Sequence, residues 1–173
     1  EEELSDLLDN QNPTIAPYAS LGEVKLRLTA NAASPEQAKD IIRPLEKEIR
    51  YRIGEKCYGE DNENLASVVL ELLRKRGETL VVAESCTGGS LGAAITAQPK
   101  ASDVFLGGVI TYSNLLKNQL LGVPNELLEQ HGAVSKEVAE EMAKRIRETL
   151  QATWGIAISG LAGPGGGTNS KPI

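Results

Sequence analysis

Hydrophobic and polar residues form different patterns along the chain, and each pattern predicts a type of secondary structure. Residues 23–29 alternate apolar and polar side chains, the period of two that a half-buried strand shows. Residues 79–83 form a short apolar run, as expected of a strand buried on both faces. Further strands are predicted at 104–111 and 155–159, with a short one at 56–58.

Apolar residues spaced by three and four predict helices between those strands. The first begins at Pro35 behind the capping residue Ser34, and Pro44 is expected to kink it or to mark a turn. The other helices are expected from residue 61 or 62 to Arg76, from Gly88-Gly89 onward, and over 114–121, 124–130 and 135–152. Strands that alternate with helices predict a layered α/β fold.

The start of the chain differs in composition from the rest. The first 20 residues contain acids and no base, and the residues before Pro13 and Pro17 are restricted to extended backbone. We therefore expect residues 1–21 to be a connector from a preceding domain. A small α/β module is expected over 22–60, and a larger α/β unit over 61–173.

Composition excludes several classes of protein. The 173 residues are 40% hydrophobic and include 17 glycines, which is typical of a globular protein. No apolar run approaches the ~18 residues of a membrane helix, and the acidic start is unlike a signal peptide, so a cytoplasmic location is expected. The net charge of −6 disfavours nucleic-acid binding. Cys57 and Cys86 lie outside any CxxC or Cys/His cluster, so neither a disulfide framework nor a zinc site is expected.

Small and polar residues gather at 83–90, AESCTGGS, where a buried strand is expected to become a helix. Free N–H groups at the start of a helix attract an anion or a developing oxyanion, and Gly88 and Gly89 let a ligand approach the backbone. Such a turn can hold Ser85 as a nucleophile. The alternative is an ordinary tight turn in which Ser85 or Thr87 caps the helix.

A serine nucleophile needs a group that accepts its proton. His131 lies at a predicted helix end, where a structural role is favoured, so a Ser-His-Asp triad is disfavoured. A desolvated lysine can also act as base, and Lys117 is the candidate because it follows a strand that runs into a helix. A surface lysine is the alternative. Cys86 is intrinsically more nucleophilic than Ser85, but without a histidine partner it is better explained as a small buried residue.

Residues 159–168 contain five glycines and two hydroxyl side chains directly after a predicted strand. Backbone N–H groups in such a loop can bind phosphate, and Ser159 and Thr168 can add hydroxyl donors. The loop lacks the Gly-Lys-Ser/Thr of a P-loop, and no GxGxxG opens a helix, so those routes to ATP or NAD binding are not supported. A flexible linker is the alternative.

Four segments follow one another along the second half of the chain: AESCTGGSLGAAIT, GGVITYSNLLKNQLLGV, HGAVSKEVAEEMA and ISGLAGPGGGTNSKPI. Together they resemble, in order and spacing, the C-terminal domain of the CinA family of competence/damage-inducible proteins. The upstream segments NPTIAPYA and GEVKLRLTA resemble the connector and the start of that family's KH-like middle module. The resemblance implies a small KH-like α/β module followed by a layered α/β/α domain, which stops at Lys171-Pro172-Ile173 inside a family block.

Members of this family with an active C-terminal domain are nicotinamide mononucleotide deamidases, which convert the carboxamide to a carboxylate and release ammonia. The resemblance implies that Ser85 is the nucleophile, Lys117 its general base and Tyr112 a residue that aligns the proton transfer. No metal or cofactor is expected. Substrate contacts are expected from residues of the two glycine-containing motifs: Glu84, Thr87, Gly88, Gly89, Ser159, Gly160, Ala162, Gly163 and Thr168.

A pyridine nucleotide is therefore the expected small-molecule partner, and a homodimer the expected assembly. Nucleic acid is not expected to bind, because residues 22–60 contain no GxxG loop and are close to neutral; no membrane partner is expected either. The alternative hypothesis is a non-catalytic nucleotide-binding or scaffold part of a CinA protein. In that case the ADP-ribose pyrophosphatase activity of the longer family members would lie in an N-terminal domain.

Overall fold

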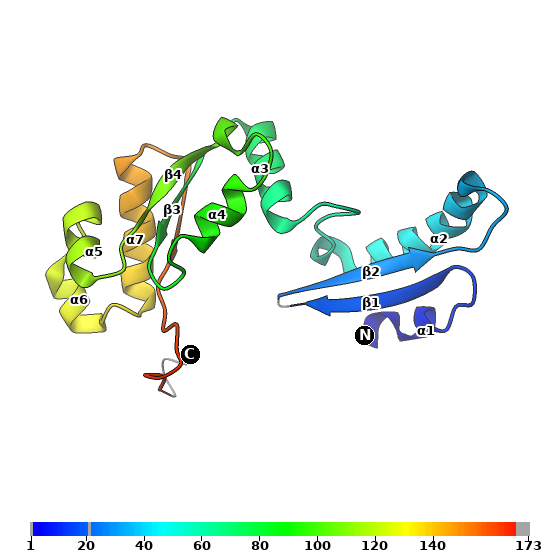
Figure 1. Cartoon of the computed structure of the whole chain (residues 1–173), viewed down its shortest axis with the longest axis horizontal. Coiled ribbons are helices and arrows are strands. Elements are labelled where there is room, and N and C mark those ends of the chain that lie inside the picture. The colour runs from blue at the N-terminus through cyan, green and yellow to red at the C-terminus, as the bar shows by residue number, and fades with distance from the viewer. Residues whose placement is uncertain (1, 21, 169–173) are drawn as a thin grey trace. The chain divides into compact units, whose positions relative to one another are not determined.

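The computed structural model describes residues 2–20 and 22–168, and the chain divides into two compact units, Glu1–Tyr58 and Gly59–Ile173 (Figure 1). The first unit contains η1 (Glu2–Leu4), α1 (Ser5–Leu8), β1 (Thr14–Ser20), β2 (Glu23–Thr29), α2 (Pro35–Ile53) and η2 (Gly54–Lys56), where η marks a 3₁₀ helix. The second contains α3 (Leu65–Arg76), β3 (Leu80–Glu84), α4 (Ser90–Thr96), η3 (Ala101–Asp103), β4 (Phe105–Ile110), α5 (Asn114–Leu121), α6 (Asn125–His131), α7 (Lys136–Thr149) and β5 (Trp154–Ile158).

In the first unit β1 and β2 form an antiparallel hairpin that packs on α2. Ile15 of β1 is buried with Leu4, Leu45 and Ile49 in one small core. The expectation that residues 1–21 form an extended connector is therefore wrong for the described residues. A two-stranded sheet consists of edge strands, and an edge strand tolerates the missing N–H of Pro17.

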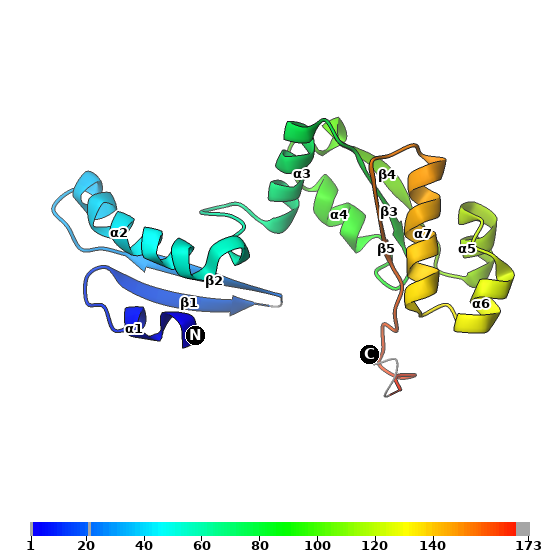
Figure 2. The same cartoon turned by 180° about the vertical axis from the view of Figure 1, so that it is seen from behind.

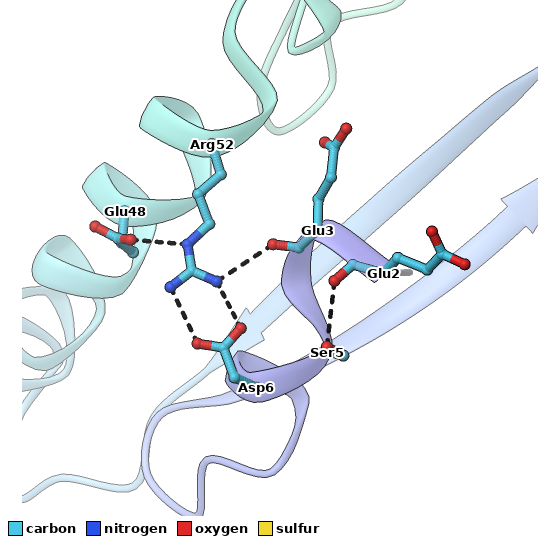
Figure 3. A network of polar contacts seen from close by, with 6 residues as sticks. All are labelled: Glu2, Glu3, Ser5, Asp6, Glu48 and Arg52. Carbon is cyan, nitrogen blue, oxygen red and sulfur yellow. Dashed lines mark hydrogen bonds and ion pairs between the residues drawn. The ribbon is translucent and has the colours of Figure 1, made fainter.

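A polar network joins the first turns of the chain to α2 (Figure 3). The Arg52 guanidinium donates to both carboxylate oxygens of Asp6, at 2.5 and 3.0 Å, and to Glu48 at 2.7 Å. It also donates to the Glu3 carbonyl at 3.2 Å, and the Ser5 hydroxyl donates to the Glu2 carbonyl. Bonding to Arg52 holds the pKa of Asp6 below its usual range. Because the network is exposed, its main effect is to orient the N-terminal turn rather than to stabilise the fold.

Two local predictions for this unit differ from the structure. Helix α2 begins behind Ser34 as predicted, with the Ser34 hydroxyl accepting from the Gln37 N–H, but it continues through Pro44 to Ile53. The residues that follow Pro44 on the buried side of α2, Leu45 and Ile49, pack in the core, and this packing offsets the lost backbone bond. The strand expected at 56–58 is absent, because Lys56 ends η2 and the residues after it are irregular.

The second unit is built on a parallel sheet with strand order β4-β3-β5. Strand β3 is central, and all five of its residues are buried. Val81 and Ala83 point to a core formed with α5, α6 and α7, whereas Leu80 and Val82 point to a core formed with α3 and α4. Figures 1 and 2 show these two groups of helices on opposite faces of the sheet. The layered α/β fold is thus confirmed.

The strands approach their neighbours so closely that two positions need glycine. A Cβ on Gly108 would lie 2.4 Å from the Val82 carbonyl oxygen, and one on Gly155 would lie 2.3 Å from the Ala143 carbonyl oxygen. Helices α5, α6 and α7 begin within one residue of their predicted starts; α6 ends one residue after its predicted end and α7 ends three residues before. Within the described ranges, no helix combines the length and the apolar composition that a membrane crossing requires.

Candidate active site

Ser85 is the first residue after the central strand β3. Its side chain is nearly enclosed, with 6% of the residue exposed, and its N–H donates to the Ile158 carbonyl at 3.0 Å. Successive side chains of a strand point to opposite faces of the sheet. Ser85 therefore continues the face of Val81 and Ala83, toward α5 and α7, and Glu84 points to the other face, toward α4.

Lys117 lies in the first turn of α5 and reaches Ser85. The Ser113 hydroxyl caps this helix by accepting from the Leu116 N–H, and helical side chains lean toward the N-terminus, so Lys117 is directed back to the strand ends. Its Nζ lies 2.9 Å from Ser85 Oγ and 2.8 Å from the Thr111 carbonyl oxygen. The structure thus brings together two residues that were paired on sequence grounds and that lie 32 positions apart.

The surroundings of Lys117 favour its neutral form. Only 1% of the residue is exposed, and burial lowers its pKa because an apolar environment disfavours the ammonium ion; the nearby Cys86 acts in the opposite direction. No ion pair to Lys117 is found among the described residues. A buried amine without a carboxylate partner has the protonation behaviour that a general base requires.

Glu84, predicted as a substrate contact, has its carboxylate bonded inside the protein, and the predicted contact stays a prediction. It is 1% exposed, and its carboxylate accepts from the N–H groups of Gly89 at 3.1 Å, Leu91 at 3.0 Å and Gly92 at 2.7 Å. Burial raises the pKa of this carboxyl, but the nearby Thr87 side chain and the hydrogen bonds from the three N–H groups outweigh it, and the net pKa lies below its ordinary value. Glu84 is therefore an internal anchor for α4.

The N–H groups of the turn after Ser85 are partly occupied. Gly88 N–H donates to the Ser85 carbonyl at 3.1 Å, and Gly89 N–H is bound by Glu84. In the described part of the chain, the backbone N–H groups of Cys86 and Thr87 make no hydrogen bond. The donors available to an oxyanion are therefore those of Cys86 and Thr87. The N–H groups of Gly88 and Gly89 are used within the turn, and the substrate contacts predicted for these residues stay predictions.

Tyr112 contributes its main chain to the site. Its carbonyl oxygen lies 3.3 Å from Lys117 Nζ, while the residue is 68% exposed. The role predicted for its phenol in aligning the proton transfer stays a prediction.

Thr111 is a site residue that the sequence reasoning missed. It is completely buried, its carbonyl binds Lys117, and its hydroxyl has no hydrogen-bond partner within the described residues. Because Glu84 pairs with Ile110 across the strands, Thr111 lies level with Ser85, directly after the end of the neighbouring strand β4. The signal that could have found it is its place at the end of a strand, next to the predicted end of β3.

The glycine-rich loop begins beside this turn. The Ser159 hydroxyl donates to the Ala133 carbonyl at 2.6 Å, and a Cβ on Gly160 would lie 3.1 Å from Cys86 Sγ. Further along, Ala162 and Thr168 are exposed and Gly163 is half-buried, in irregular backbone. Residues 169–173 lie outside the described residues, so the phosphate-binding role of the loop stays a prediction.

His131 ends α6, as predicted for a helix-terminal histidine, and its Nδ1 lies 3.6 Å from the Glu137 carboxylate. Within residues 2–20 and 22–168, no group of three or more His, Cys, Asp or Glu side chains is arranged to hold a metal ion.

Comparisons with known proteins identify relatives for both units. A family model of the CinA C-terminal domain matches residues 62–173, and a model of the damage-inducible protein CinA KH domain matches residues 1–59. The CinA-like protein of Prochlorococcus marinus (strain MIT 9313) is 61% identical over 172 residues, 99% of this chain and 40% of that protein. The CinA-like protein of Synechococcus sp. (strain CC9902) is 59% identical over the same length. The chain thus spans about two fifths of the length of these curated relatives.

Solved structures agree with these matches. The competence damage-inducible protein A (ComA) from Klebsiella pneumoniae subsp. pneumoniae MGH 78578 is 42% identical with a TM-score of 0.60, over 62% of this chain and 67% of that one. A competence-damaged protein (CinA) superfamily protein from Escherichia coli is 34% identical with a TM-score of 0.61, over 69% of this chain and 73% of that one.

Proposed function

The chain belongs to the CinA family, and from this premise we propose that its second unit is an amidohydrolase that deamidates nicotinamide mononucleotide. The products are nicotinate mononucleotide and ammonia, and the reaction proceeds through an acyl-enzyme on Ser85. The observation that carries the proposal is the buried contact of 2.9 Å between Ser85 Oγ and Lys117 Nζ. A hydroxyl next to an amine of lowered pKa is an activated nucleophile.

The hydrogen-bond partners of Lys117 support its action as base. A neutral amine has two hydrogens and one lone pair. The carbonyl oxygens of Thr111 and Tyr112, at 2.8 and 3.3 Å, can accept the two hydrogens. The lone pair then points to Ser85, whose hydroxyl donates its proton to it. Two carbonyls and one hydroxyl thus orient the amine for proton transfer before substrate arrives.

The reaction then follows from these positions. Ser85 Oγ attacks the carboxamide carbon while Lys117 takes the hydroxyl proton. When the tetrahedral intermediate collapses, its C–N bond breaks and Lys117 passes that proton to the departing nitrogen, which leaves as ammonia. A water molecule then attacks the ester carbonyl, its proton goes to Lys117, and the carboxylate leaves as Ser85 is restored.

The negative charge on the carbonyl oxygen needs donors that are already in place. The N–H groups of Cys86 and Thr87 are the available pair, since they follow the nucleophile directly in the chain. Removal of one such donor typically costs ~10²- to 10³-fold in kcat, because preorganised dipoles act strongly in a site shielded from water.

We assign substrate selection to the residues around Ser85 and Lys117. The loop 159–168 is proposed to bind the ribose phosphate through its backbone N–H groups and through Thr168. The exposed phenol of Tyr112 is proposed to contact the substrate during proton transfer. The proposal uses no metal and no cofactor.

The first unit is proposed to support assembly rather than catalysis. Its open two-stranded sheet and its net negative charge, with 8 Lys and Arg against 11 Asp and Glu over residues 1–58, suit a contact between copies better than a nucleic-acid surface. We propose a homodimer that acts in the cytoplasm. Sedimentation of the full-length protein and of a form without this unit tests the assembly directly.

The activity test is ammonia release from nicotinamide mononucleotide by the protein at the full length of its relatives. Ser85→Ala and Lys117→Ala are expected to abolish turnover, and Lys136→Ala, which changes an exposed lysine on α7, is the matched control. A folded full-length protein that releases no ammonia would contradict the amidase. Binding of the nucleotide by that inactive protein would then favour the non-catalytic alternative.

A further inference from the structure

A single buried carboxylate holds the segment that contains the proposed nucleophile. Glu84 Oε2 accepts from the N–H groups of Gly89 and Leu91, and Oε1 accepts from the N–H of Gly92. The main chain of Glu84 belongs to the central strand, where its carbonyl accepts from the Thr111 N–H at 2.7 Å. One residue therefore joins the sheet to the first turn of α4, on both sides of Ser85.

We propose that Glu84 is a positioning residue: its carboxylate clamps the start of α4 and thereby holds Ser85, and the N–H groups that follow it, in the geometry that Lys117 and the oxyanion require. This inference rests on the proposed amidase function and assigns Glu84 no contact with substrate.

The clamp leaves little freedom to the segment between its two ends. Ser85 is tied to β5 through the bond from its N–H to the Ile158 carbonyl, and its own carbonyl accepts from the Gly88 N–H. Gly88 and Gly89 have φ values of 59° and 103°, which lets the chain reverse within this span. Loss of the carboxylate would leave the N–H groups of Gly89, Leu91 and Gly92 without their acceptor, so the C-terminal end of the turn would no longer be bonded to the sheet.

The glycine inside α4 fits the same device. Gly92 is the third residue of α4, and glycine is a weaker helix former than alanine. A Cβ there would lie 3.3 Å from Glu84 Oε1, closer than an ordinary contact. The absence of a side chain gives the carboxylate room to reach the N–H of Gly92.

The Glu84 carboxylate points away from Lys117, and this orientation lets the amine stay neutral. A buried carboxylate beside Lys117 would hold the amine in its charged form, which cannot accept a proton. Alternation along β3 directs Glu84 to the α4 side and Ser85 to the side of α5. The negative charge is satisfied by N–H groups, as the lowered pKa of Glu84 also indicates.

The test uses the full-length protein with Glu84→Gln. The amide keeps the length of the side chain but turns one acceptor into a donor that faces N–H groups. We expect kcat to fall about 100-fold with KM within about threefold, since a nucleophile displaced by about 1 Å loses that much. The acidic limb of the pH profile, which reports Lys117, is expected to stay in place. Glu78→Gln is the matched control, because Glu78 precedes β3 and bonds the Trp154 indole at 2.7 Å.

A second measurement reads the nucleophile without the proposed substrate. A fluorophosphonate probe reacts with an activated serine as Ser85 Oγ displaces fluoride from phosphorus, and Ser85→Ala supplies the blank. Labelling of folded Glu84→Gln is expected to slow about as much as kcat falls. Labelling at the wild-type rate would overturn the inference, as would a wild-type protein that is not labelled at all. A third outcome is that the wild-type protein is labelled but releases no ammonia, while Glu84→Gln is labelled slowly. That outcome would contradict nicotinamide mononucleotide as the substrate and would still support the positioning role of Glu84.

Gly92→Ala keeps the test decisive if Glu84→Gln does not fold. Its methyl group displaces the carboxylate while both charge and donors remain, so an intermediate loss of labelling is expected. Wild-type labelling in folded Gly92→Ala would contradict the clamp.

Discussion

The turn after β3 and the loop after β5 look alike in sequence but differ in structure. Both follow a parallel strand of one sheet, and both combine glycines with hydroxyl side chains. After β3, the N–H groups of Gly89, Leu91 and Gly92 donate to the carboxylate of Glu84, which ties the turn to the start of α4. Residues 159–168 have Ser159 bonded at their start and continue as irregular backbone. A glycine-rich motif therefore becomes a rigid site where a buried acceptor binds its N–H groups.

The first test of this comparison removes the proposed base, Lys117, from the site that follows β3. Lys117→Met is expected to lower turnover by about 10³-fold or more, the size of a lost general base together with its alignment. Burial of an amine costs stability, so the free energy of unfolding in urea is expected to stay equal or to rise. The combination separates a catalytic lysine from a structural one, because loss of a structural residue would lower both quantities.

The same variant is also expected to change how the free energy of unfolding depends on pH. The pKa of folded Lys117 lies below the ordinary 10.5, so between the two values the unfolded chain binds more protons. Wild-type stability from this group therefore rises with pH across that window, and the cost of the charged amine is present in full below the folded pKa. Lys117→Met is expected to flatten this rise in urea titrations; an unchanged slope would contradict the lowered pKa.

A second comparison places alanine at one glycine of each segment. Gly89 has a φ of 103°, and its added Cβ would lie 3.0 Å from Ile110 Cδ1, so Gly89→Ala is expected to cost about 1–3 kcal/mol of unfolding free energy. Gly165 has open space around it, and Gly165→Ala is expected to stay within about 0.5 kcal/mol or to stabilise slightly. Equal effects on thermal unfolding would mean that the two segments are equally constrained.

The smallest expected effect concerns the loop. If the loop binds the ribose phosphate, Thr168→Ala removes one hydroxyl donor and is expected to raise KM about fivefold with kcat unchanged, as for one hydrogen bond of about 1 kcal/mol. Steady-state kinetics with nicotinamide mononucleotide measure both constants. A loss confined to kcat would instead place Thr168 in the chemical step.

Periodicity located most elements, β2 and the start of α2 included, but it missed β1 in the first unit. Residues 14–20 contain Pro17, which argued against regular structure, yet they pair along their whole length with β2. The reason is that the partner strand and the core around Ile15 supply the stability, and local propensity cannot report either. Pro44 misled in the same way, since packing of its helix outweighs one lost bond.

The sequence by itself determined most strands and helices of the second unit, the turn that carries Ser85 and the proposal that Lys117 is its base, because these depend on local residue types and spacing. The tertiary structure decided the rest: the enclosure of Glu84, the two carbonyls that orient Lys117, and the N–H groups that remain available. Each of these depends on the face of the sheet to which a side chain points and on hydrogen bonds between segments far apart in the chain. Burial then sets the protonation of the groups involved, and burial exists only once the helices have packed on the sheet.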